Sequence, residues 1–139
     1  MLPFEWREEY SVHISQLDAQ HRRLIGLLGE LRRSVHSGTS EKLAPAALRE
    51  VLNYAEWHLR REELVLRVRG YPKYAEHKAE HDAYREKLVS LQIQAGRKDL
   101  GIRISNFLTE WWRYHILTSD QDYARFFRTQ PARAIITPS

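Results

Sequence analysis

Seven residues that bind metals well fall where a helical protein normally places apolar side chains. Six of them lie on or beside the apolar stripes of the predicted helices, namely His21, His58, Glu62, His77, His81 and His115, and the seventh, Asp120, follows His115 by five residues. Burying so many titratable groups without partners would cost roughly several kcal/mol each. Neutral imidazoles mixed with carboxylates are the ligands that a borderline or hard transition metal prefers. The core is therefore predicted to be built around metal.

The spacing of these residues supports a shared site. His77 and His81 lie one helical turn apart on the same face, and so do His58 and Glu62. Either pair alone is common by chance, and the plain alternative is a surface pair or a satisfied core histidine. However, every predicted helix supplies a candidate, and two helices supply two each, as in the metal sites of helical bundles.

Two other kinds of metal site are alternatives, a zinc-peptidase site and a ferritin-like di-iron site. Residues 77–81 also match H-x-x-E-H, a zinc-peptidase pattern in which His77 and His81 bind zinc and Glu80 is the base. The ferritin-like di-iron site needs E-x-x-H twice, and this sequence contains no E-x-x-H. Iron stores and carboxylate di-iron oxygenases are therefore disfavoured, whereas the peptidase stays open as a remote alternative.

The elements that must position these groups are helices. Apolar residues recur every three to four positions, which predicts helices at about 15–37, 44–68, 72–95 and 99–118. Gly38, Gly70 and Gly96 separate them with short turns. We expect an all-α, up-down-up-down antiparallel four-helix bundle, preceded by an N-terminal aromatic arm and followed by a short C-terminal helix. Residues 1–139 are expected to form a single domain, with a frayed tail at 129–139.

Composition narrows the class of protein. The chain has 139 residues, no cysteine and no apolar run long enough to cross a bilayer, so disulfides and thiolate metal sites are excluded. No secretory leader is visible, and we expect a cytoplasmic protein without a membrane partner. The net charge is +4, but basic residues are dispersed among acidic ones, so we expect no nucleic-acid partner.

The chain resembles the hemerythrins, particularly their bacterial single-domain members. The segments that carry the resemblance are FEWREEYSVHI at 4–14, LDAQH at 17–21, YAEWHLRREE at 54–63, GYPKYAEHKAEH at 70–81 and WWRYHILTSDQDY at 111–123. The resemblance implies that one iron is bound by His77, His81 and His115 and the other by His21 and His58. Glu62 and Asp120 would bridge both irons together with an oxide or hydroxide.

The same resemblance implies a function. The two-histidine iron would keep one open position for dioxygen or another small diatomic ligand, giving an oxygen carrier, store or sensor with no catalytic residue. The alternative is an oxidase, a peroxidase or a nitric-oxide-handling activity at the same centre. Bacterial single-domain members are often monomers, so we expect a monomer, and no protein partner is indicated.

The expected ligand pocket shows the main departure from the family. It would be lined by Trp112, Trp111, Leu59 and Leu24. Trp112 stands where the family often has a leucine, so it would narrow the pocket, donate its indole N–H to a ligand or pack between helices. The other departures, Leu59 for a common phenylalanine, Leu66 for methionine and His13 for glycine, are expected to be tolerated.

Overall fold

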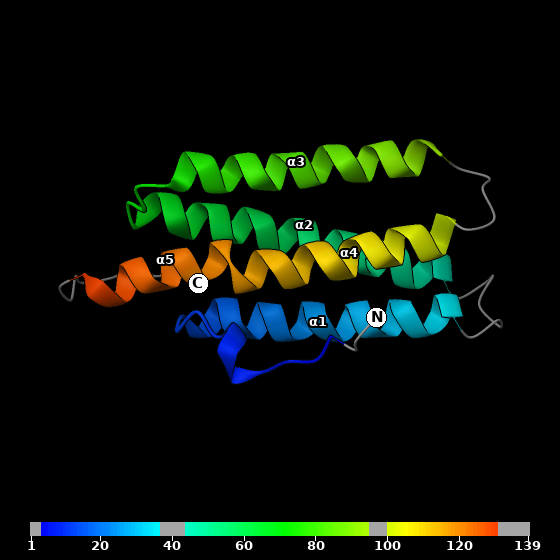
Figure 1. The fold of residues 1–139 in the computed structure, drawn as a ribbon, viewed down its shortest axis with the longest axis horizontal. Coiled ribbons are helices and arrows are strands. Elements are labelled where there is room, and N and C mark those ends of the chain that lie inside the picture. The colour runs from blue at the N-terminus through cyan, green and yellow to red at the C-terminus, as the bar shows by residue number, and fades with distance from the viewer. Residues whose placement is uncertain (1–3, 37–43, 95–99, 131–139) are drawn as a thin grey trace.

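The computed structural model describes residues 4–36, 44–94 and 100–130. Five α-helices follow a 3₁₀ turn, η1, at Glu8–Tyr10: α1 Ser15–His36, α2 Ala44–Val68, α3 Tyr74–Ile93, α4 Leu100–Leu117 and α5 Ser119–Thr129. Successive long helices run in opposite directions side by side, and α5 extends α4 beyond the end of the bundle (Figure 1). The predicted all-α antiparallel four-helix bundle is confirmed, and the described residues contain no strand. Most of the predicted tail, residues 131–139, lies outside the described residues.

The turn between α2 and α3 explains why α3 begins at Tyr74 rather than at the predicted residue 72. Gly70 adopts a φ of 73°, a left-handed conformation that glycine reaches without strain. The N–H of Tyr71 then bonds the carbonyl of Leu66 at 2.9 Å. Pro72 disfavours a helical conformation at the residue before it, so the chain completes a turn before α3 can start.

A break at Thr118 separates α4 from α5. The hydroxyl of Thr118 donates to the Tyr114 carbonyl at 2.7 Å, and its φ and ψ of −115° and −74° depart from helical values. In one straight helix, residues five apart point about 140° away from each other. The break instead brings His115 and Asp120 to the same interior region, where both are fully buried.

The predicted metal ligands lie between two apolar clusters. One cluster includes Leu24, Ala55, Leu59 and Trp112, and the other includes Leu17, Val65, Leu66 and Tyr123. Along α1, α2 and α4–α5 the polar residues occur between members of the two clusters. The apolar packing therefore encloses the polar centre from both ends of the bundle.

The N-terminal arm packs against the helices as predicted. Phe4 and Tyr10 are buried and meet edge to face with ring centroids 5.6 Å apart. Asp18 accepts hydrogen bonds from the Ser11 hydroxyl at 2.6 Å and the Val12 N–H at 2.8 Å, which tie the arm to α1. His13, where the resemblance to the hemerythrins leads us to expect glycine, adopts a φ of 59°. That left-handed conformation gives a physical reason for glycine at this position.

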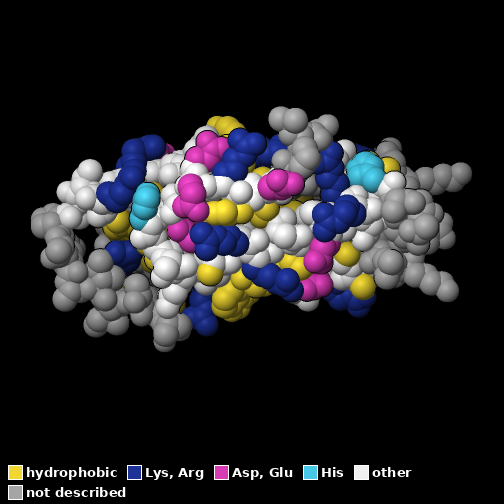
Figure 2. All heavy atoms as spheres, turned by 90° about the horizontal axis from the view of Figure 1, so that it is seen from below, with side chains coloured by type: hydrophobic (Ala, Val, Ile, Leu, Met, Phe, Trp, Pro, Cys, Tyr) yellow, Lys and Arg dark blue, Asp and Glu magenta, His cyan; other side chains and the backbone are white. Residues whose placement is uncertain are grey.

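The surface carries mixed charge. On the face shown in Figure 2, acidic and basic side chains are interspersed rather than gathered by sign. Within the described ranges, no helix combines the length and the apolar character needed to span a bilayer.

Candidate metal centre

All seven predicted ligands converge in the interior of the bundle. Helix α1 supplies His21, α2 His58 and Glu62, α3 His77 and His81, α4 His115, and α5 Asp120. His77 is 4% exposed and the other six are fully buried. Five helices thus deliver seven titratable side chains to one buried region.

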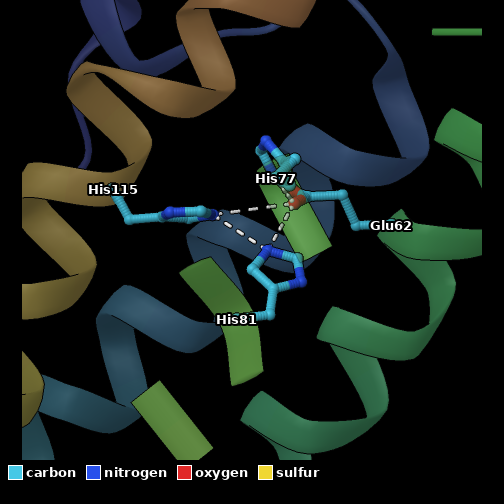
Figure 3. A group of neighbouring side chains, drawn as sticks. All are labelled: Glu62, His77, His81 and His115. Atoms are coloured by element: carbon cyan, nitrogen blue, oxygen red, sulfur yellow. Dashed lines mark hydrogen bonds and ion pairs between the residues drawn. The ribbon is translucent and has the colours of Figure 1, made fainter. Parts of the chain in front are cut away.

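Three histidines surround one oxygen of Glu62. The Nε2 atoms of His77, His81 and His115 lie 2.6, 3.1 and 3.7 Å from Glu62 Oε1. Figure 3 shows the three rings pointing at this carboxylate from α3 and α4. The Nε2 atoms of His81 and His115 are only 3.0 Å apart. Two ring nitrogens this close need either a shared proton or a metal between them, and this group can hold a metal ion.

Two histidines face the other oxygen of the same carboxylate. The Nε2 atoms of His21 and His58 lie 3.7 and 3.4 Å from Glu62 Oε2. These residues form a second group that can hold a metal ion, and Glu62 belongs to both groups. Glu62 therefore presents one oxygen to each group of histidines.

Asp120 divides its oxygens in the same way. Its Oδ1 lies 3.3 Å from His77 Nε2 and 3.1 Å from His115 Nε2, whereas its Oδ2 lies 3.3 Å from His21 Nε2. Two carboxylates thus span from a three-histidine group to a two-histidine group. This arrangement fits two adjacent metal ions that share both carboxylates.

Buried polar atoms that make no hydrogen bond support this fit. His21 Nε2, His58 Nε2 and both carboxylate oxygens of Asp120 are buried and accept or donate no hydrogen bond within the described part of the chain. Buried polar atoms are nearly always satisfied, and an atom that is not needs a specific explanation. Metal ions among these atoms would satisfy them together.

Without metal, the two buried carboxylates of the centre are balanced by protonated histidines. Burial alone would raise the pKa of Glu62, but the surrounding histidines, His115 foremost, hold it well below the ordinary value. Burial alone would lower the pKa values of His21 and His77, yet Asp120 and Glu62 raise both to about 9. The carboxylates thus stay anionic and retain protons on the imidazoles, and metal ions would displace those protons.

Outer partners orient three of the five rings. The Nδ1 of His81 bonds Glu63 Oε2 at 2.7 Å, that of His115 bonds Glu80 Oε1 at 3.1 Å, and that of His58 bonds Gln20 Oε1 at 2.7 Å. These bonds leave Nε2 free as the ligand atom of each ring. Sequence reasoning missed Glu63 and Gln20, because each meets its histidine only across two packed helices.

The position of Glu80 gives no support to the zinc-peptidase alternative. Its carboxylate accepts from His115 Nδ1 and from the Ser119 hydroxyl at 2.5 Å. It therefore lies on the outer side of the His115 ring, away from the Nε2 atoms that face the centre. A peptidase would need this carboxylate beside the metal-bound water.

The two tryptophans of the predicted pocket lie beside histidines of the centre. Trp112 is fully buried, and its ring centroid is 5.7 Å from that of His58. Its indole N–H has no hydrogen-bond partner among the described residues. Trp111 instead stacks on His115 at 4.5 Å, and Leu59 and Leu24 are fully buried. Trp112 thus both packs in the core and borders the two-histidine group.

Comparisons with known proteins agree with this geometry. Residues 12–127 match the family described as Hemerythrin HHE cation binding domain. A bacteriohemerythrin of Clostridium acetobutylicum is 30% identical over 127 residues, covering 86% of this chain and 98% of the relative. One of Stenotrophomonas maltophilia is 30% identical over 121 residues, covering 86% and 78%. A hemerythrin-like protein of Naegleria gruberi is 26% identical over 121 residues, covering 87% and 91%.

Proposed function

Because the chain belongs to the hemerythrin family, we propose that it binds dioxygen reversibly at a carboxylate-bridged pair of iron ions. The iron ligands in this proposal are His77, His81 and His115 on one side, His21 and His58 on the other, and Glu62 and Asp120 between them. The protein would act as a carrier, store or sensor of oxygen.

The division of carboxylate oxygens carries this proposal. Glu62 Oε1 and Asp120 Oδ1 face the three-histidine group, while Glu62 Oε2 and Asp120 Oδ2 face the two-histidine group. Counting these atoms, the three-histidine position receives five protein ligands and the two-histidine position four. The two-histidine position therefore has more room for an external ligand such as dioxygen.

The chain's own residues prepare the site for a small neutral ligand. Leu24, Leu59 and Trp112 are fully buried, so they keep bulk water from the two-histidine side. The hydroxyl of Tyr123, also buried, donates to Glu62 Oε2 at 3.1 Å and fixes the orientation of this carboxylate. Bound iron would supply the redox chemistry that dioxygen binding requires and that no side chain of this centre provides.

The test is an anaerobic oxygen titration of the reduced, iron-quantified protein. Reversible binding predicts a visible charge-transfer band that rises when oxygen is admitted and falls when oxygen is removed, over several cycles. A protein that holds two iron ions per chain but gains no visible band with oxygen would contradict the proposal.

The packing of Trp112 favours a second candidate, an oxidase, peroxidase or nitric-oxide-handling activity at the same centre. The indole occupies space beside His58 where a smaller side chain would leave room for bound oxygen. A crowded site would hold oxygen briefly and oxidise irreversibly. This candidate predicts that the first exposure to oxygen oxidises the centre and that only an added reductant restores the reduced form. With excess reductant, the protein should consume oxygen catalytically.

A further inference from the structure

The outer partners of the histidine rings differ between the two groups. In the three-histidine group, His81 and His115 each bond a carboxylate through Nδ1. In the two-histidine group, His58 bonds the neutral amide of Gln20, and His21 Nδ1 is buried with no hydrogen-bond partner in the described ranges. Carboxylates therefore bond Nδ1 atoms in the three-histidine group, whereas among the described residues neither histidine of the two-histidine group has a carboxylate at Nδ1.

Glu63 shares one oxygen between a histidine and an arginine. Its Oε2 lies 2.7 Å from His81 Nδ1 and 3.0 Å from Arg85 Nη1. The Glu63 side chain is 12% exposed, so solvent screens this contact little. Arg85 is in turn bound by Glu56 at 2.9 and 3.1 Å and by Asp82 at 2.9 Å, which fixes its guanidinium in place.

We propose that Glu63 and Arg85 are positioning residues that set the metal affinity of the three-histidine position. Glu63 raises this affinity and Arg85 lowers it. The inference deepens the proposed function and rests on its metal centre. An anion behind Nδ1 increases the donor strength of the Nε2 that faces the metal. Arg85 shares the same oxygen and withdraws part of that charge, so the two side chains act on His81 with opposite sign.

Two substitutions separate this charge effect from a purely structural role. Glu63→Gln keeps an oxygen that can accept from His81 Nδ1 but removes the charge, so the first step of anaerobic Co²⁺ binding should weaken by about tenfold. Arg85→Gln leaves Glu63 charged and should make Co²⁺ binding tighter, by up to about tenfold. If the network only holds the helices together, both substitutions weaken binding, and that result would overturn the proposal.

A double-substitution cycle tests whether Arg85 acts through Glu63. In the Glu63→Gln background, Arg85→Gln should have no effect, because the charge on which Arg85 acts is gone. Glu63→Asp keeps the charge and should bind Co²⁺ within about threefold of the parent. Arg7→Gln removes an exposed arginine of the N-terminal arm and should change nothing.

The parent protein separates failure of this inference from failure of the proposed function. Binding is followed by the visible absorption of Co²⁺, and folding of each variant by circular dichroism. A parent chain that cannot take up two metal ions contradicts the proposed centre itself. A parent that takes up two, with Glu63→Gln and Arg85→Gln shifted in the same direction, contradicts only the roles given to Glu63 and Arg85.

Discussion

Replacing Trp112 with leucine tests whether the indole limits access to the centre. Trp112 is fully buried and lies 5.7 Å from His58, 5.6 Å from Tyr84 and 4.9 Å from Trp111, measured between ring centroids. Trp112→Leu should open space beside the two-histidine group, where the proposed ligand binds. Oxygen should then associate faster with the reduced protein. The protein should also complete more cycles of oxygen binding and release before its centre is oxidised irreversibly.

The same substitution carries a stability cost that follows from burial. Replacing the indole by an isobutyl group removes about 60 Å³, which at about 24 cal/mol per Å³ costs about 1.5 kcal/mol if the surroundings do not collapse. Lost apolar burial adds about 1 kcal/mol, for a total of about 2–3 kcal/mol. For a chain of this length the midpoint of thermal unfolding should fall by about 6–10 °C.

The assays are stopped-flow oxygen binding and thermal unfolding, with Leu108→Ala as the matched control. Leu108 is fully buried on the same helix, α4, one turn further than Trp112 from His115. This control should lose about 2–5 kcal/mol without faster oxygen binding. If Trp112→Leu destabilises the protein but binds oxygen no faster than Leu108→Ala, Trp112 does not border the ligand route.

Three further predictions concern the centre itself. Asp120→Asn keeps the shape of the side chain but removes its negative charge and replaces one of its two oxygens by NH₂, so iron measured by mass spectrometry should fall from two per chain to about one; full occupancy would refute a bridging role. In the metal-free protein, His21 and His77 have pKa values raised to about 9, so their contribution to the free energy of unfolding is complete below about pH 6.5 and is lost as pH rises through 9. Thermal unfolding between pH 6.5 and 9.5 should show that loss in the metal-free protein and not in the iron-loaded one, and identical profiles would contradict it. Tyr123→Phe removes the donor to Glu62 and should destabilise the metal-free protein by about 1–2 kcal/mol in chemical denaturation, whereas an unchanged midpoint would show that this bond contributes nothing.

The fold could be predicted from the sequence because its signals are local. Apolar periodicity located the four long helices, and Gly70 with Pro72 located the turn after α2. The start of α3 was placed two residues early because periodicity does not show where a turn's hydrogen bonds end. The end of the fourth helix at 118 and the short helix after it were predicted, but not the cause of the break, which is the Thr118 hydroxyl bonding back to α4 rather than a proline or glycine.

The residues brought together at the centre could be selected from the sequence because they interrupt apolar stripes. A histidine or glutamate at a stripe position, such as His58 or Glu62, must be buried if the helix packs at all. Glu63 and Gln20 gave no such signal. Both are polar residues at positions where a solvated side chain is ordinary, and only packing of α3 and α1 against α2 brings them to His81 and His58.

The measurement that tests the central claim most directly is anomalous diffraction at the iron edge from crystals of the iron-loaded protein. We expect two iron positions per chain. One lies among the Nε2 atoms of His77, His81 and His115 and the other between His21 and His58, with an oxygen of Glu62 and of Asp120 bound to each. A single iron position, or two that share neither carboxylate, would contradict it.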